Sequence, residues 1–203
     1  MSLFSHDAAV REEESVDLLC GVDEAGRGPL AGPVFAAAVI LPRDTVMEGL
    51  ADSKKLSPKK REALYAEIME RAAAWCIASA TVAEIERLNI LGASMLAMRR
   101  AIGGLALRPE LILVDGNSSP GSGCPERCVV GGDDTSASVA AASILAKVER
   151  DLYMLELSKR YPEYEFYKHK GYGTRLHYSR LDEYGPCPAH RDAFLRKWRM
   201  KKV

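Results

Sequence analysis

The sequence has no excess of either charge, no motif of paired cysteines and no hydrophobic run long enough to cross a membrane. Its 28 basic and 28 acidic residues balance, so overall charge indicates no class of partner. The cysteines are odd in number and include no C-x-x-C pair: Cys20, Cys76, Cys124, Cys128 and Cys187. Free thiols are typical of a reducing compartment, and no signal region opens the chain. We expect a cytoplasmic protein with no membrane partner.

Several common site motifs are also missing. The stretch GRGPLAGP matches neither G-x-x-x-x-G-K-[ST] nor a clean G-x-G-x-x-G, so a nucleotide cofactor is a poor match. No G-x-S-x-G pattern marks a serine nucleophile. The spacing of Cys124 and Cys128 matches no common zinc-ligand pattern. These absences leave little support for nucleophilic, dinucleotide-dependent or zinc chemistry.

One stretch, residues 18–40, combines apolar segments with acids and glycines. Residues 18–22 and 34–41 have the length and composition of buried strands. Asp23 and Glu24 follow the first segment, and a loop rich in glycine and proline comes next. Glycine allows the backbone to approach a ligand closely. Because side chains alternate between the faces of a strand, both acids can serve one site only if the strand ends or twists there.

The rest of the chain predicts alternating helices and strands after a polar, partly disordered lead-in over residues 1–17. Helices are expected over residues 58–74, 84–102, 137–157 and 176–183, and strands over residues 75–82, 111–114 and 128–130. The third helix should turn one apolar stripe to the core: Ala141, Ile144, Leu145, Val148, Leu152 and Leu155. This order predicts an α/β fold with a mixed central sheet flanked by helices, in one domain over residues 18–203.

Three predicted strands end at acidic residues: Asp23 with Glu24, Asp115, and Asp133 with Asp134. A single acid at such a place is usually a solvated turn residue, whereas three such ends beside glycines favour a shared site. Converging carboxylates require a counter-cation, and oxygen ligands favour Mg²⁺, with Mn²⁺ as a substitute. Two such ions can activate water and stabilise the leaving oxygen at a phosphorus centre. The pattern therefore predicts phosphodiester hydrolysis.

Basic residues are concentrated near the C-terminus. Residues 160–203 contain eleven lysines and arginines against five acids. This distribution suits binding of a polyanion, although a solvated tail would have the same charge pattern. A non-catalytic nucleic-acid-binding module is therefore one alternative; it would need these basic residues but not three acidic strand ends.

Seven sequence blocks, in order across nearly the whole chain, resemble the ribonuclease HII family. They read GVDEAGRGPLAGPV, DSKKLS, RLNIL, LVDGN, GDDTSASVAAASILAKVERD, HKGYGT and GPCPAHR. The resemblance implies a ribonuclease H-like fold with a helical C-terminal extension, and hydrolysis of the RNA strand of RNA–DNA hybrids. It also implies incision 5′ of a ribonucleotide embedded in duplex DNA, which leaves 3′-hydroxyl and 5′-phosphate ends.

The same resemblance implies roles for individual residues. The catalytic, metal-binding acids would be Asp23, Glu24, Asp115 and Asp133, holding Mg²⁺ or Mn²⁺. Asp133 is chosen over Asp134 because the family's last acid directly follows a glycine and precedes the AAAS block by a fixed interval.

The substrate-binding residues come from the same blocks. Gly26, Arg27 and Gly28 would sense the 2′-hydroxyl of the ribonucleotide, which backbone atoms can approach closely. Tyr172 would pack on the sugar at the junction and favour deoxyribose on its 3′ side. Phosphate contacts would come from basic side chains: Lys54, Lys55, Lys147, Lys170, His190 and Arg191. Lys147 lies on a mostly apolar helix, which favours a buried functional cation.

A second alternative is another nuclease with a ribonuclease H-like core, such as a junction resolvase or the longer ribonuclease HIII. The short lead-in leaves no room for the extra domain of the latter. We expect a monomer that acts on RNA–DNA hybrids and on DNA duplexes containing ribonucleotides. The basic tail matches no motif for a clamp or polymerase partner.

Overall fold

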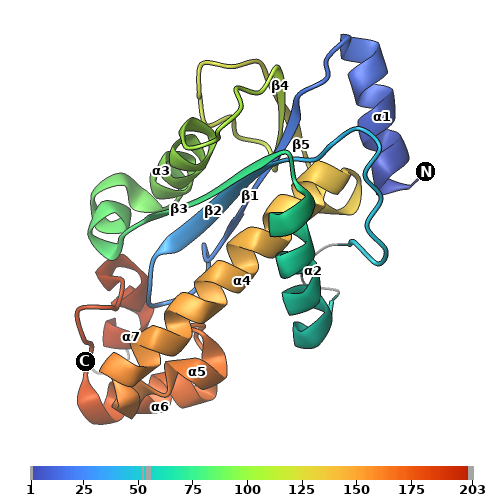
Figure 1. Cartoon of the computed structure of the whole chain (residues 1–203). Coiled ribbons are helices and arrows are strands. Elements are labelled where there is room, and N and C mark those ends of the chain that lie inside the picture. Colours follow the sequence, from blue (N-terminus) through green and yellow to red (C-terminus); the bar gives the residue numbers. More distant parts are fainter. Residues whose placement is uncertain (1, 52, 54–55, 201–203) are drawn as a thin grey trace.

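The computed structural model describes residues 2–51, 53 and 56–200, and a five-stranded sheet with helices on both faces lies at its centre (Figure 1). The strands are β1 (Leu19–Ala25), β2 (Val34–Ile40), β3 (Ala74–Ala80), β4 (Leu111–Asp115) and β5 (Glu126–Val129). Their order in the sheet is β3-β2-β1-β4-β5. The pairs β3–β2 and β2–β1 are antiparallel, whereas β1–β4 and β4–β5 are parallel. The mixed sheet expected from the sequence is thus confirmed.

Two apolar cores lie on opposite faces of this sheet. One face is covered by α3 (Val82–Gly103), and the other by α2 (Pro58–Arg71) and α4 (Ala137–Arg160) (Figure 1). Successive residues of β2 alternate between them, as the period of a strand requires. Ala36 packs in the α3 core, and Ala37 packs in the α4 core. No helix in the described part of the chain is both long and apolar enough to span a membrane.

Helix α4 and the sheet approach each other closely at Gly21. A Cβ atom there would lie 2.0 Å from the carbonyl carbon of Ser138 and 2.2 Å from the amide nitrogen of Val139. Only glycine leaves room for the α4 backbone at this distance. The first turns of α4 are therefore pressed against β1, two residues before Asp23.

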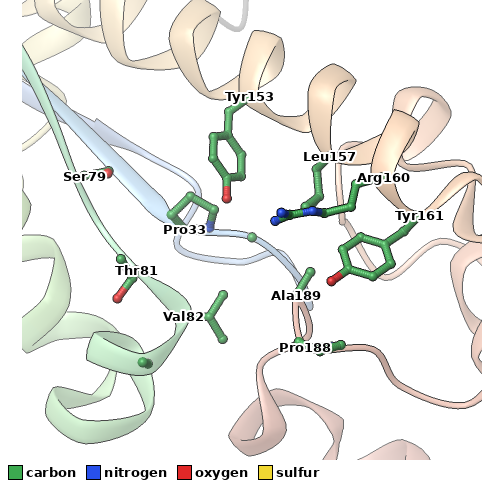
Figure 2. A pocket seen from close by; sticks show the side chains of 12 residues that line it. Pro33, Ser79, Thr81, Val82, Tyr153, Leu157, Arg160, Tyr161, Pro188 and Ala189 are labelled. Carbon is green, nitrogen blue, oxygen red and sulfur yellow. The ribbon is translucent and has the colours of Figure 1, made fainter.

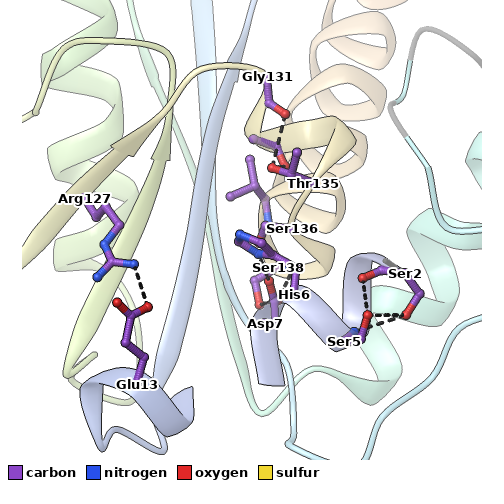
Figure 3. Close-up of polar contacts among 12 residues, drawn as sticks. Ser2, Ser5, His6, Asp7, Glu13, Arg127, Gly131, Thr135, Ser136 and Ser138 are labelled. Atoms are coloured by element: carbon purple, nitrogen blue, oxygen red, sulfur yellow. Dashed lines mark hydrogen bonds and ion pairs between the residues drawn. The ribbon is translucent and has the colours of Figure 1, made fainter. Parts of the chain in front are cut away.

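The expected disordered lead-in is wrong, because Leu3–Glu14 forms helix α1. Its buried Asp7 accepts hydrogen bonds from the backbone N–H and the hydroxyl of Ser138, both at 2.8 Å, and Glu13 pairs with Arg127 of β5 at 3.5 Å (Figure 3). These contacts tie α1 to α4 and to the edge of the sheet. The polar sequence concealed the helix because part of its buried face consists of hydrogen-bonded charged groups rather than apolar side chains.

The expected core stripe of α4 is wrong at its end, where Leu152 is 47% and Leu155 is 39% exposed. Beyond Val148 the helix packs against the C-terminal segment through Met154 and Leu157. That segment contains α5 (Phe166–His169), α6 (Arg175–Tyr184) and α7 (Arg196–Met200), gathered at the far end of α4 (Figure 1). The helical C-terminal extension is confirmed.

Candidate active site

The register of the parallel strands makes Asp23 and Asp115 neighbours. Val22 of β1 pairs with Val114 of β4, and each aspartate is the next residue along its strand. Parallel strands end at the same edge of a sheet, so the two carboxylates stand at one edge. β5 lies on the other side of β4, which brings the third acidic strand end to the same edge, as expected from the sequence.

The turn after β5 is held by Asp115, whose Oδ1 accepts a hydrogen bond from the Gly132 N–H at 2.8 Å. Asp133 and Asp134 follow on a single short 3₁₀ turn. Asp133 is only 6% exposed, whereas Asp134 faces solvent. This difference agrees with the choice of Asp133, but the role of Asp133 as a metal ligand stays a prediction.

Asp23 and Glu24 lie inside β1, which continues to Ala25 rather than ending at the acids. Asp23 stands opposite Ala37, and Glu24 stands opposite Ala36 on the other face. Both nevertheless line one pocket of about 270 Å³ at the end of the strand. Its remaining lining is Ala25, Gly26, Arg27, Gly28, Ser53, Ser143, Lys147 and Tyr172.

Asp23 is 4% exposed, and its surroundings disfavour a lone negative charge. Burial raises the pKa of its carboxyl well above the ordinary value, and the charges of Glu24 and Asp115 raise it further. Hydrogen bonds from the Ser143 side chain and the Glu24 N–H oppose this shift of the pKa. A buried carboxylate beside two others is stabilised by a divalent cation.

The ligand type at this edge also fits such a cation, because carboxylate oxygens are preferred by Mg²⁺ and Mn²⁺. Across residues 2–51, 53 and 56–200, no three histidine, cysteine or acidic side chains already stand in an arrangement that could hold a metal ion.

Another wall of the pocket is formed by Tyr172 and by Gly26, Arg27 and Gly28 of the glycine loop (residues 26–33). Gly26 has φ +105°, and a Cβ atom there would lie 2.2 Å from Nε of Arg150, so this position requires glycine. Gly28 faces Tyr172, since a Cβ atom there would lie 3.9 Å from Cε1 of the ring. The ring of Tyr172 is 43% exposed, with the Arg150 guanidinium carbon 5.7 Å from its centroid.

Comparison with known proteins decides the family. The sequence model for ribonuclease HII matches residues 20–201. A ribonuclease HII of Idiomarina loihiensis is 57% identical over 177 residues, which are 87% of this chain and 95% of the relative. The chain belongs to the ribonuclease HII family. Its members are metal-dependent endonucleases that cleave RNA in RNA–DNA hybrids.

Solved structures of ribonuclease HII enzymes have the same fold. The ribonuclease H2 from Pyrococcus horikoshii OT3 matches with a TM-score of 0.75 and 26% identity over 91% of this chain and 99% of that one. The ribonuclease HII of Archaeoglobus fulgidus, solved in complex with PCNA, matches with a TM-score of 0.73 and 25% identity over 86% and 94% of the two chains. The expected ribonuclease H-like fold is therefore confirmed.

Of the basic residues expected at this ribonuclease HII site, some line the pocket and others lie outside it. Lys147 lines the pocket half-buried and pairs with Asp151 at 2.6 Å. Lys170 lines a different pocket, which Asp151 also lines, and its ammonium group donates a hydrogen bond to the carbonyl of Tyr167. Arg27 pairs with Glu24 at 3.2 Å. The two other expected lysines, Lys54 and Lys55, lie outside the described residues.

The expected phosphate contacts of His190 and Arg191 are wrong, because these side chains are 4% and 0% exposed. The Arg191 guanidinium instead donates at 2.7 to 3.2 Å to backbone carbonyls of the glycine loop: Gly26, Arg27, Pro29, Gly32 and Pro33. His190 bonds to another buried histidine. Arg191 thus supports the loop from behind. Its partners are carbonyls that every residue carries, so the sequence could not reveal them.

Two further residues were missed by the sequence analysis. Ser143 hydrogen-bonds to Asp23, and fully buried Arg150 donates to the carbonyls of Ala31 at 3.3 Å and Lys170 at 3.1 Å. Arg150 thereby joins the glycine loop to the segment carrying Tyr172. A signal was present, because positions 143, 147 and 150 are polar and their spacing places them on one face of the helix.

A second pocket of about 300 Å³ lies beyond Pro33, between the ends of β3 and α4. Tyr153, Arg160, Tyr161 and Thr81 surround it (Figure 2). None of the site residues expected from the sequence lines this pocket. The acidic pocket at the end of β1 is therefore the candidate active site.

Proposed function

We propose that this ribonuclease HII incises duplex DNA on the 5′ side of a single embedded ribonucleotide, as well as the RNA strand of hybrids. The proposal is carried by one observation. Asp23 and Glu24 share a pocket with Gly28 and Tyr172, so groups suited to metal binding and groups suited to reading a sugar lie within reach of one nucleotide. The products would carry 3′-hydroxyl and 5′-phosphate ends.

In this proposal the four acids hold two divalent cations, Mg²⁺ or Mn²⁺. Asp23 and Asp133 bind on the side of the nucleophile, and Asp115 and Glu24 complete the pair. When bound, such cations supply the positive charge that activates the attacking water and stabilises the leaving oxygen. The protein itself positions the carboxylates that would hold the cations, because they stand at the ends of adjacent strands of one sheet.

Recognition of the ribonucleotide would depend on the pocket wall formed by the glycine loop and Tyr172. Backbone atoms of Gly26, Arg27 and Gly28 read the 2′-hydroxyl, which both donates and accepts hydrogen bonds. Tyr172 packs on the neighbouring sugar. Lys147 and Lys170, together with Lys54 and Lys55, contact phosphates, which mainly position a duplex rather than specify it.

We also propose that residues 18–203 act as one catalytic domain in a monomer. All residues that line the candidate site lie within this range, which supports a single catalytic domain. Five free cysteines support a reducing compartment such as the cytoplasm. Although the Archaeoglobus relative was solved with PCNA, the described tail residues match no clamp motif that would extend this partner to the present chain.

The test is cleavage of an end-labelled DNA duplex that contains one ribonucleotide, in Mg²⁺, in Mn²⁺ and in chelator. The proposal predicts one metal-dependent cut, directly 5′ of the ribonucleotide. An all-DNA duplex of the same sequence is the control and should stay intact. Folded protein that binds the duplex but cuts it with neither metal would contradict the proposal and favour a non-catalytic binding module.

A further inference from the structure

Three of the four histidines of the chain gather in the core behind Tyr172. His169, His177 and His190 are 7%, 0% and 4% exposed, and the rings of His169 and His177 stack with centroids 4.3 Å apart. The pocket of the proposed active site does not include them. They nevertheless belong to the segments that carry Tyr172 and Arg191.

Hydrogen-bond directions assign the protons of two of these rings. Nδ1 of His177 lies 3.0 Å from the carbonyl oxygen of Tyr172, which can only accept, so this nitrogen carries a proton. In a neutral ring Nε2 then accepts, and it lies 3.0 Å from Nε2 of His190, which must donate. Nδ1 of His190 in turn accepts from the Cys187 N–H at 3.0 Å. The result is one directed chain of hydrogen bonds from Cys187 to Tyr172.

This chain of bonds ends on a backbone that is held in an uncommon conformation. Lys170 and Gly171 have φ values of +49° and +83°, a region that non-glycine residues adopt only when surrounding contacts hold them there. The carbonyl of Tyr172 also accepts from the Thr174 N–H at 2.8 Å. The His177 bond is therefore one of two that fix this carbonyl.

The same short segment supports the glycine loop. Next to His190, the Arg191 N–H donates to the Leu30 carbonyl, and the Leu30 N–H donates to the Gly171 carbonyl, both at 2.8 Å. His190 and Arg191 thus face two different targets, the Tyr172 segment and the loop. His190 and Arg191, which are adjacent in the chain, therefore fix the position of the Tyr172 segment relative to the glycine loop.

We propose that His177 and His190 are positioning residues for ribonucleotide selection. The pair fixes the carbonyl of Tyr172 and thereby sets its ring opposite Gly28. The proposal rests on the proposed role of Tyr172 at the junction. Displacement of a reading group by about 1 Å is enough to cost one to two orders of magnitude in rate, so loss of the anchor should reduce selectivity.

Two substitutions at one position separate anchoring from simple stability. His177→Asn keeps a donor near the position of Nδ1, toward Tyr172, whereas His177→Gln keeps only a group near Nε2, toward His190. Each variant loses one hydrogen bond, so their urea unfolding midpoints should fall similarly. The readout is kcat/KM for a lone ribonucleotide followed by DNA, divided by kcat/KM for a continuous hybrid.

We expect His177→Gln to lower this ratio roughly tenfold, toward the value of Tyr172→Ala, and His177→Asn to change it less than about twofold. His6→Gln, on α1, is the matched control and should leave the ratio unchanged. Equal ratios for His177→Asn and His177→Gln, whether both normal or both reduced, would overturn the proposal.

Two further measurements separate the possible failures. Long-range ¹H–¹⁵N spectra near pH 7 should show a proton on Nδ1 of His177 and on Nε2 of His190. The opposite tautomers would contradict the directed chain of hydrogen bonds and overturn the proposal. If Tyr172→Ala keeps a normal ratio, the junction role of Tyr172 fails, and the selectivity role of the histidines fails with it. If Tyr172→Ala lowers the ratio and His177→Gln does not, only the histidine proposal fails.

Discussion

Gly28 and Tyr172 face each other in the pocket that Asp23 and Glu24 also line, and a Cβ atom on Gly28 would lie 3.9 Å from Cε1 of the tyrosine ring. This spacing is ordinary van der Waals contact, so the loop and the ring already enclose a narrow gap. The gap has the size of a methyl or hydroxyl group, and a 2′-hydroxyl that entered it would bring its nucleotide close to the carboxylates. The roles of Gly26 and Gly28 can therefore be distinguished by experiment.

Gly26→Ala should destabilise the fold, whereas Gly28→Ala should impair function with little loss of stability. At Gly26 the new methyl group would lie 2.2 Å from Arg150 at φ +105°, and such strain costs roughly 1 to 3 kcal/mol. At Gly28 the methyl group fits but fills the gap used by the 2′-hydroxyl. Urea unfolding and kcat/KM on a single-ribonucleotide duplex measure the two effects. A Gly28→Ala enzyme with normal kcat/KM would contradict the role of the loop.

Removal of the Asp7 carboxylate should weaken the tie between α1 and α4. Asp7→Ala leaves the buried N–H and hydroxyl of Ser138 without their acceptor, which costs roughly 1 to 3 kcal/mol. Asp7→Asn retains one acceptor oxygen and should lose less. Glu12→Ala, at an exposed position of the same helix, is the control. Equal unfolding midpoints for Asp7→Ala and Glu12→Ala would refute the tie.

Stability should fall as the pH is lowered from about 6.5 toward 4. Burial lowers the pKa of His177 and His190 to about 4 each, from an ordinary 6.5. Between these values the unfolded chain binds protons that the folded protein does not, so unfolding is favoured as pH falls. The slope is at most about 1.4 kcal/mol per pH unit for each histidine. Urea unfolding at pH 7.5, 6 and 5 measures it, and His190→Gln should flatten the slope; an unchanged slope would contradict the assignment.

The strands and the acids were predictable because each depends on local sequence. The segments 18–22, 34–41 and 111–114 are apolar, and an aspartate directly follows the first and the last of them, so both the sheet and the meeting of Asp23 with Asp115 followed from pattern and topology. Helix α4 was equally visible from its alanines. Family blocks then supplied residue roles that pattern alone left open.

The supporting contacts could not be predicted, because their partners carry no sequence signal. Arg191 bonds to backbone carbonyls, and His190 bonds to a histidine 13 residues away. Both were therefore taken for phosphate-binding groups. Helix α1 was missed for a related reason, since Ser138, which donates the hydrogen bonds to its buried carboxylate, lies 131 positions from Asp7. Distant polar contacts of this kind appear only once the chain is folded.

The most direct test of the active site compares Asp133→Asn with Asp134→Asn. The two residues are adjacent, yet only Asp133 is buried, at 6% exposure, on the turn that Asp115 holds at Gly132. Asp133→Asn should lower kcat by roughly 10³-fold, or about 4 kcal/mol of transition-state stabilisation, and weaken Mn²⁺ binding measured by electron paramagnetic resonance. Asp134→Asn should stay within about threefold of the normal rate. Near-normal turnover and Mn²⁺ binding by folded Asp133→Asn would contradict the proposed centre.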